Sequence, residues 1–395
     1  MISFDSEKNR VFLSPSHVLF GDGAAEQIVD VLAAIQISSG ALLIVADREV
    51  VNLNLIDQVR DPLVAATFEV DCFNDIVGEP TLLTVNKLVE LCRTKPYVAV
   101  IGVGGGSALD MSKLAAAMAV NYGKITDYLG PARFPKNPLP LINIPTTAGT
   151  GAEATGVSML SIEEKKAVVF GSQLVPTAAI LDPLMTRTLP PKVTAGTGLD
   201  ALSHALEAYM SINASPFTDS QALITISNVT RWLKTAYEDG ENLNARRAMI
   251  YSAYTGGLSL NAGVVLGHSV AYTISNRVHL PHGVSCAMAL PYTIAFNFQE
   301  VKVKLQPVAK LVLGGSKNTS RRLIDKVTEL VCVLGIPLSL KEIDLQESDL
   351  DEMVAECLGK YPRPTNPAPI TQGRLEKFYR FMYDGDIEGC CKYFC

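Results

Sequence analysis

The residues best suited to chemistry are an aspartate and several histidines in the second half of the chain. Asp200 and His204 stand four positions apart in a stretch of helical character, so in a helix their side chains lie on one face. His268 follows on a later segment, and either His279 or His282 comes after it. One carboxylate with three imidazoles suits Fe²⁺ or Zn²⁺ and leaves a position open for a substrate oxygen. The pattern therefore indicates a divalent-metal site.

Spacing alone does not choose between His279 and His282 as the last ligand. Gly283 follows His282 and lets the backbone turn tightly there, whereas bulky residues flank His279, which favours His282. A lone histidine is more often a core or surface residue than a ligand, and we interpret His17 in that way. Taken alone, the aspartate–histidine pair fits a structural role as well as it fits a metal site.

A glycine-rich loop in the first half of the chain could hold a phosphate. The segment Gly102–Ser107 follows an apolar, β-branched run and opens a stretch of helical character. Glycines let the backbone approach a ligand closely, and a helix N-terminus offers N–H groups and the positive end of its dipole to a pyrophosphate. The loop departs from the G-x-G-x-x-G fingerprint because Ser107 takes the place of its last glycine. A tight strand-to-helix turn explains the loop equally well.

Two further features favour nucleotide binding at this end of the chain. Asp47 ends an apolar run, where a carboxylate can accept hydrogen bonds from ribose hydroxyls and repel a 2′-phosphate; a simple strand-ending aspartate is the alternative. The threonines and glycines of segment 145–153 follow another apolar run and suit contact with phosphate or a nicotinamide ribose, although such turns are also structural. Together with the glycine loop, these features favour NAD, in preference to NADP.

The first half of the chain predicts the parallel sheet that would position these loops. A helical pattern at 80–92 separates two of its apolar runs, and strand, helix, strand implies a parallel α/β unit. The expected strands are 41–46, 97–103, 139–144 and 178–181. Long helical patterns follow Leu189-Pro-Pro191, at 195–209, 216–237, 245–262 and 320–334. We expect an α/β nucleotide-binding domain with a parallel sheet at 1–184 and an all-α metal-binding and catalytic domain at 185–395.

Length and composition describe a globular protein of about two domains. The 395 residues are 48% hydrophobic and 19% charged, with a formal net charge of -6. This length exceeds the usual limit for one hydrophobic core, and the charge offers no basic field for nucleic acid. The N-terminus lacks the features of a secretory signal, and no apolar run approaches the roughly 18 to 20 residues of a membrane span. We expect neither nucleic acid nor membrane as a partner.

The eight cysteines are scattered and include no metal-type C-x-x-C pair. This usage fits a reducing, cytoplasmic environment in which most thiols are small core residues. Cys390, Cys391 and Cys395 form a cysteine-rich tail. Metal binding or lipid attachment is the alternative there, and we expect a mobile end.

Taken in order, these segments resemble the iron-containing (group III) alcohol dehydrogenases, which belong to the dehydroquinate synthase-like superfamily. The similarity extends from Phe20-Gly21 to about residue 367, which is nearly the whole chain. The matching segments are 104–113, 144–153, 182–183, 189–191, 198–209, 281–283 and 364–367. The resemblance implies a nucleotide-binding α/β domain, a helical domain and a catalytic site in the cleft between them.

The resemblance also implies the site residues. As metal ligands it implies Asp200, His204, His268 and His282, the last two fourteen positions apart as in relatives. As cofactor-binding residues it implies Asp47, Gly104, Gly105, Gly106, Ser107, Asp110, Thr146, Thr147 and Thr150, with Lys166 a match in a divergent stretch. The implied activity is metal-dependent, NAD(P)-linked interconversion of a small alcohol with its aldehyde or ketone. Relatives are commonly dimers or larger, so a homodimer or larger homo-oligomer is expected.

The chain departs from the family pattern at Tyr272. Many of these dehydrogenases have a histidine there, four residues after the third ligand, beside the nicotinamide. We place Tyr272 in the catalytic site, but its pKa of about 10 makes it a poorer proton carrier at neutral pH than histidine at about 6.5. Glu207, three positions after His204, is expected to be a carboxylate on the helix surface.

Other activities on this fold stay open. A maleylacetate reductase and a hydroxyacid-oxoacid transhydrogenase are the alternatives within the family. A dehydroquinate-synthase-like lyase would need a phosphate pocket rich in Lys and Arg, and few basic residues lie between the first and last metal ligands. A metalloprotein whose metal is only structural is the non-enzymatic alternative.

Overall fold

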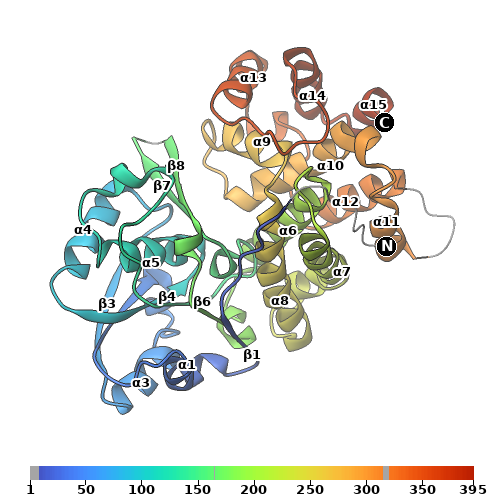
Figure 1. The fold of residues 1–395 in the computed structure, drawn as a ribbon. Coiled ribbons are helices and arrows are strands. Elements are labelled where there is room, and N and C mark those ends of the chain that lie inside the picture. The colour runs from blue at the N-terminus through green and yellow to red at the C-terminus, as the bar shows by residue number, and fades with distance from the viewer. Residues whose placement is uncertain (1–8, 164, 315–319) are drawn as a thin grey trace. The chain divides into compact units, whose positions relative to one another are not determined.

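The computed structural model describes residues 9–163, 165–314 and 320–395, which form two compact units (Figure 1). One unit is Leu13–Leu189, and the other is Pro190–Cys395 together with the described part of Met1–Phe12. Arg10 Nε donates to the carbonyl of Asn213 at 3.2 Å, and the ring of Phe12 packs on Phe217 at 5.6 Å. The limits of the units therefore differ from the expected boundary at 184, and the N-terminal segment belongs with the helices.

A six-stranded parallel sheet forms the centre of the α/β unit, as the sequence predicts. Its order is β1 (His17–Phe20), β9 (Ala178–Leu181), β6 (Leu141–Pro145), β4 (Tyr97–Gly104), β2 (Ala41–Asp47) and β3 (Glu69–Ile76). Strands β2 and β4 each lie between two other strands and are buried on both faces, which explains their continuous apolar sequence. All six strands run in one direction, so their carboxyl ends meet at one edge of the sheet.

Helices cover both faces of this sheet (Figure 1). The helices α4 (Leu82–Cys92) and α5 (Gly106–Met118) pack on one face, and α1 (Ile28–Ala34) and α3 (Asp57–Ala65) pack on the other. A hairpin that the sequence analysis did not predict, β7 (Val157–Ile162) with β8 (Lys165–Phe170), pairs with the short β5 (Gly130–Pro131). The remaining elements are α2 (Arg48–Asn52), η1 (Ala24–Gln27), η2 (Ile125–Tyr128), η3 (Ala152–Ala154), η4 (Ser172–Leu174) and η5 (Pro183–Thr186).

The second unit is helical, again as predicted. Its long helices are α6 (Pro191–Met210), α7 (Pro216–Glu238), α8 (Leu243–Ser259), α9 (Leu266–Ser275), α10 (His282–Val301), α11 (Gln306–Leu313), α12 (Arg321–Val333), α13 (Leu350–Gly359), α14 (Gln372–Asp384) and α15 (Ile387–Phe394), with short turns η6 (Leu260–Ala262), η7 (Lys341–Ile343) and η8 (Glu347–Asp349). Helix α6 is buried along most of its length and contacts α7, α8, α9 and α10. A helix enclosed in this way can carry polar groups away from water.

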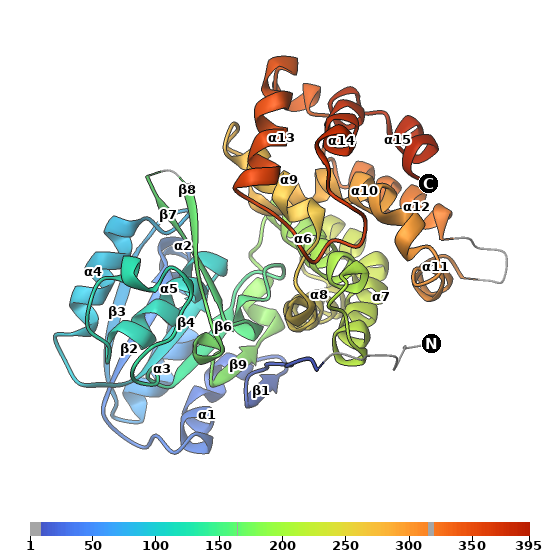
Figure 2. The ribbon, with the colours of Figure 1, turned by 45° about the horizontal axis from the view of Figure 1, so that its top comes forward.

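The cysteine-rich tail is ordered, so the expectation of a mobile end is wrong. It forms helix α15, on which Cys390 and Cys391 are buried. Phe394 packs on the ring of Phe296 of α10 at 5.0 Å. Figure 2 shows α15 beside α14 in the helical unit. Apolar residues at helical spacing hold the tail on the core. The high density of cysteine made this helical spacing difficult to recognise in the sequence.

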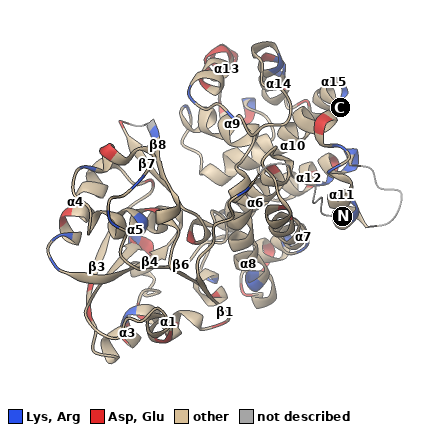
Figure 3. Ribbon diagram, viewed as in Figure 1, with Lys and Arg blue, Asp and Glu red and all other residues tan. Residues whose placement is uncertain are grey.

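Among the residues that the structure describes, Lys, Arg, Asp and Glu are distributed over both units without a dominant basic region (Figure 3). No disulfide links any of the eight cysteines, all of which lie in the described part of the chain. Among the described helices, none combines the length and the apolar character needed to cross a membrane.

Candidate metal and cofactor sites

Helix α6 presents three polar side chains to the interior of the helical unit. Asp200, His204 and Glu207 follow at spacings of four and three residues, and each is at least 94% buried. Nε2 of His204 lies 3.8 Å from Oδ1 of Asp200. The helical spacing read from the sequence therefore does place an oxygen and a nitrogen side by side.

Helix α9 brings His268 to the same place, and Glu207 fixes it there. Nδ1 of His268 lies 2.7 Å from Oε1 of Glu207, and the backbone N–H groups of Val265 and His268 donate to Oε2 at 2.9 and 3.4 Å. A Cβ added at Gly267 would lie 2.6 Å from Oε1, so only glycine allows this approach. The expectation that Glu207 is a surface carboxylate is wrong, because the residue is fully buried and hydrogen-bonded to the start of α9.

The first residue of α10 is His282, which joins the group from a third helix. Its ring lies 5.4 Å from that of His268. A Cβ on Gly283 would lie 2.2 Å from the carbonyl oxygen of Gly196, so this glycine permits close contact between α10 and α6 instead of the turn expected from the sequence. His279, the alternative ligand, is exposed in the loop before α10.

The donor atoms of Asp200, His268, His282 and Cys286 lie within 4.8 Å of one another. Two donors on one ion are separated by at most about twice a bond length of 2.0 to 2.3 Å, so a small adjustment would let these atoms share a metal. His204 is outside this set of four, although its ring stacks on that of His268 at 4.9 Å. The sequence analysis did not identify Cys286; its position one helical turn after His282 was the available indication.

Unpartnered polar atoms indicate that the group suits a cation. Oδ1 of Asp200 and Nδ1 of His204 are buried and form no hydrogen bond with the described residues. Such atoms are costly to bury unless a ligand satisfies them. Burial opposes ionisation of Asp200, yet the neighbouring histidines more than offset it and keep the pKa of this carboxyl below its usual value. Burial raises the pKa of Glu207 to about 8, although Arg363 acts in the opposite direction. A divalent ion on the adjacent imidazole would lower this pKa and keep the carboxylate ionised at neutral pH.

Tyr272 stands beside the histidines. Its ring stacks on His282 at 5.5 Å, and the guanidinium of Arg363 lies 5.6 Å from the centre of the same ring. Burial raises the pKa of Tyr272 to about 12, although Arg363 acts in the opposite direction. The phenol is therefore protonated throughout the neutral range.

In the α/β unit, three loops converge at the carboxyl ends of neighbouring strands. Asp47 at the end of β2 accepts a hydrogen bond from Gly105 N at 2.6 Å. Gly104 has a φ of +154°, and a Cβ there would lie 2.3 Å from Oδ2 of Asp47. A Cβ on Gly106 would lie 2.8 Å from Thr150 Cγ2, in the loop after β6. A side chain at Gly104 or Gly106 would therefore overlap the neighbouring loop.

This convergence contains nearly all the cofactor residues expected from the sequence. Gly105 is the N-cap of α5, Gly106 and Ser107 begin the helix, and no side chain caps it among the described residues. The N–H of Thr146 donates to Gly104 O at 2.9 Å, and Thr147 Cγ2 lies 3.4 Å from the position of a Cβ on Gly105. An uncapped helix N-terminus beside a glycine loop suits a phosphate group.

Two of the expected cofactor residues have structural partners. Asp110 accepts from Met159 N at 2.8 Å and lies 3.3 Å from Nζ of the buried Lys113, so it joins α5 to β7. Lys166 lies on β8, where its ammonium group pairs with Glu79. These contacts neither support nor oppose a role of Asp110 or Lys166 in binding the cofactor.

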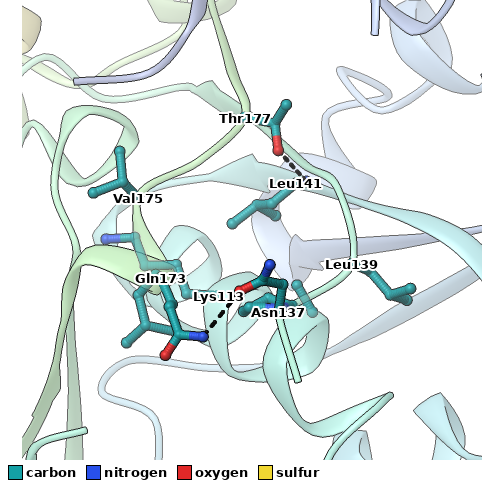
Figure 4. Close-up of a pocket in the computed structure, with 10 residues that line it drawn as sticks. Lys113, Asn137, Leu139, Leu141, Gln173, Val175 and Thr177 are labelled. Atoms are coloured by element: carbon teal, nitrogen blue, oxygen red, sulfur yellow. Dashed lines mark hydrogen bonds between the residues drawn. The ribbon is translucent and has the colours of Figure 1, made fainter. Parts of the chain in front are cut away.

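A cavity of about 160 Å³ also lies in the α/β unit (Figure 4). Lys113, Asn137, Gln173 and Thr177 line it, together with apolar side chains. The amide of Gln173 donates to Asn137 Oδ1 at 3.1 Å, and Leu141 N donates to Thr177 Oγ1 at 3.2 Å. None of the cofactor residues expected from the sequence lines this cavity, so it is separate from the glycine loop.

Comparisons with known proteins give one family for both units. Residues 15–183 match the family model described as iron-containing alcohol dehydrogenase, and residues 194–383 match the C-terminal model of the Fe-containing alcohol dehydrogenase family. The chain is 37% identical over 387 residues to long-chain-alcohol dehydrogenase 1 of Geobacillus thermodenitrificans, covering 95% of this chain and 97% of that protein.

Solved structures agree with the sequence matches. A 1,3-propanediol oxidoreductase superposes with a TM-score of 0.88 at 29% identity, over 94% of this chain and 99% of that one. Sulfoacetaldehyde reductase from Bifidobacterium kashiwanohense, solved in complex with NAD⁺, superposes with a TM-score of 0.87 at 29% identity, over 96% of this chain and 100% of that one.

Proposed function

The chain belongs to the iron-containing alcohol dehydrogenase family, and from this premise we propose that it is an NAD-linked, divalent-metal-dependent dehydrogenase of small alcohols. Its substrates would be a primary or secondary alcohol and the corresponding aldehyde or ketone. The observation that carries the proposal is the buried Asp200 Oδ1, which accepts no hydrogen bond from the described residues yet lies among imidazole donors.

Asp200, His204, His268 and His282 are the proposed metal ligands. Their carboxylate and imidazole donors suit Fe²⁺ and Zn²⁺ alike. Glu207 orients His268, because a carboxylate that accepts from Nδ1–H leaves Nε2 as the nitrogen that ligates. When bound, the metal supplies Lewis acidity for the substrate oxygen and NAD supplies the hydride chemistry.

The glycine loop, the N-terminus of α5 and the threonine loop are proposed to bind NAD. The residues we assign are Asp47, Gly104, Gly105, Gly106, Ser107, Asp110, Thr146, Thr147 and Thr150, with Lys166 a further candidate. Burial raises the pKa of Asp47 to about 6, although the Gly105 hydrogen bond opposes this, so the carboxylate is mainly ionised at neutral pH. A negative charge beside the ribose would repel a 2′-phosphate and favour NAD over NADP.

Tyr272 is proposed to help position the substrate and the imidazole of His282. With its pKa at about 12, it can donate a hydrogen bond but transfers a proton poorly at neutral pH. The proton released from the alcohol therefore reaches solvent by a route other than ionisation of Tyr272.

The direct test is turnover of an alcohol and aldehyde panel, followed by nicotinamide absorbance. The full chain would be assayed as purified, after chelation, and after reloading with Fe²⁺ or Zn²⁺. We expect chelation to abolish turnover and reloading to restore it, while NAD still binds to the chelated protein. Full activity without metal would reject the proposed role of the four ligands.

The same assay separates the alternatives. Exchange between a hydroxyacid and an oxoacid without added NAD would identify a transhydrogenase, and selective reduction of maleylacetate would identify that reductase. Elimination of phosphate from a sugar phosphate would indicate a lyase, and metal binding without nicotinamide binding would indicate a structural metalloprotein. We further propose a homodimer or larger assembly in a reducing, cytoplasmic environment, which light scattering and localisation of a tagged chain would test.

A further inference from the structure

Cys286 is a thiol within the proposed metal site that the four-ligand interpretation does not use. It lies one helical turn after His282 on α10, so both side chains are on one face of the helix. Its Sγ atom lies 3.5 Å from His282 Nε2 and 4.0 Å from His282 Nδ1. The side chain is completely buried.

The surroundings of Cys286 are unusual for a structural cysteine. A buried cysteine normally behaves as a small apolar side chain and packs among others. Here Sγ is within 4.8 Å of donor atoms from Asp200, His268 and His282. A thiol that faces a carboxylate and two imidazoles has the neighbours of a metal ligand.

A second observation indicates that a cation belongs at this position. Asp200 is 3% exposed, and its Oδ1 atom accepts no hydrogen bond from any residue that the structure describes. Nδ1 of the buried His204 likewise forms no hydrogen bond with the described residues. An ion bound among these donors would satisfy the carboxylate oxygen and lie within reach of Sγ.

We propose that Cys286 is a fifth protein ligand of the bound divalent metal, contributing a thiolate beside Asp200 and the three histidines. This inference rests on the proposed function, because it needs a metal at that site. On binding, the S–H bond breaks, a sulfur–metal bond forms and the proton passes to solvent, with no change in oxidation state. Five protein donors leave one position of an octahedral ion for a substrate oxygen.

A thiolate ligand has consequences for metal choice. The Asp200 and Cys286 anions together balance the charge of a divalent ion, whereas the carboxylate alone leaves one positive charge. Soft thiolate donors favour Zn²⁺ over harder ions, so this chain should retain Zn²⁺ more strongly relative to Fe²⁺ than the same site without the sulfur.

Cobalt substitution of the full chain tests the proposal without an activity assay. A thiolate bound to Co²⁺ gives an intense sulfur-to-cobalt charge-transfer band in the near ultraviolet, while weaker visible bands report bound cobalt whatever its ligands. We expect the near-ultraviolet band in the parent and in a Cys92→Ser control, since Cys92 is a buried thiol in the core of the α/β unit. We expect it to disappear in Cys286→Ser while the visible bands persist.

Each other result overturns the proposal. Absence of the charge-transfer band from cobalt-loaded parent protein, or its persistence in Cys286→Ser, would show that Cys286 is not a ligand. Failure of the parent to bind cobalt or zinc would reject the metal site itself, and the inference with it. Should Cys286→Ser not fold, X-ray absorption of the zinc-loaded parent decides: we expect a sulfur at about 2.3 Å, and a shell of nitrogen and oxygen alone would contradict it.

Discussion

Oε1 of Glu207 lies 2.7 Å from Nδ1 of His268, and this contact joins α6 to the first turn of α9 inside the proposed metal site. The same carboxylate accepts the N–H groups of Val265 and His268 through its other oxygen. One residue therefore orients an imidazole and stabilises the start of the helix that carries it. The bond also selects the tautomer in which Nε2 can ligate a metal.

Glu207→Gln should weaken metal binding with little change in the fold. The glutamine oxygen can still accept from the backbone, but its NH₂ group would donate to Nδ1 of His268 and leave the proton on Nε2. We expect metal affinity to fall by about 10- to 100-fold, as for other residues that orient metal ligands. Titration against a competing chelator measures it, with the exposed Glu238→Gln as control. Equal affinity in both variants would contradict the orienting role.

The composition of the proposed metal site could be predicted only in part from the sequence. Asp200 and His204 belong to one helix, so their spacing in the sequence was enough to predict that they lie on the same face. The burial of Glu207 depends on α9, which approaches from sixty residues further along the chain and needs Gly267 to do so. No periodicity in α6 distinguishes that glutamate from a surface residue. Its partner is non-local, and this is why the expectation was wrong.

The fold shows the same distinction between local and non-local information. Strands β2 and β4 are apolar along their length because both faces are covered, so the central sheet was predictable. The β7–β8 hairpin was not, because its strands are partly exposed and depend on contacts such as Ser158 Oγ with Asp110 O at 2.9 Å. The contact of Arg10 with Asn213 likewise joins residues 203 positions apart, about half the chain, and leaves no sequence pattern.

Substitution of Tyr272 should separate a positioning role from proton transfer. A group that transfers the proton typically contributes at least about 100-fold to the rate, so Tyr272→Phe should lower kcat by less than that. Tyr272→His would introduce a group that titrates at about pH 6.5 and should add a limb to the pH profile of kcat. A loss of kcat beyond about 100-fold in the phenylalanine variant would show that Tyr272 lies on the proton route.

Asp47→Asn should relax the preference for NAD over NADP. Asparagine keeps an oxygen that can accept from Gly105 N but removes the charge that would face a 2′-phosphate. We expect the ratio of kcat/KM for NADP to that for NAD to rise by about tenfold or more, which corresponds to about 1.4 kcal/mol. The exposed Asp61→Asn serves as a control for loss of one negative charge in the same unit. An unchanged ratio would remove Asp47 from cofactor selection.

Glu153, in the short helix η3 after β6, should make the α/β unit less stable as pH rises. Burial raises its pKa to about 7 in the folded chain, only partly opposed by a backbone hydrogen bond and by Lys113. A carboxyl group whose pKa is raised by folding binds its proton more strongly in the folded chain than in the unfolded chain. Its favourable contribution to the free energy of unfolding is therefore complete below about pH 4.5 and is lost as pH rises through about 7. Ionisation at high pH leaves a buried charge whose Oε1 has no hydrogen-bond partner among the described residues.

Glu153→Gln removes this titration, so its stability relative to the parent should increase between about pH 5 and pH 8, by at most about 3 kcal/mol. Thermal unfolding of both proteins at the two pH values measures the difference. The exposed Glu90→Gln, on α4 of the same unit, should show no such change. If the difference in stability between Glu153→Gln and the parent stays constant with pH, Glu153 is ionised to the same extent in the folded and the unfolded chain. Lys113 would then have to stabilise the carboxylate fully. In that case Lys113→Met should destabilise the parent more at pH 8 than at pH 5.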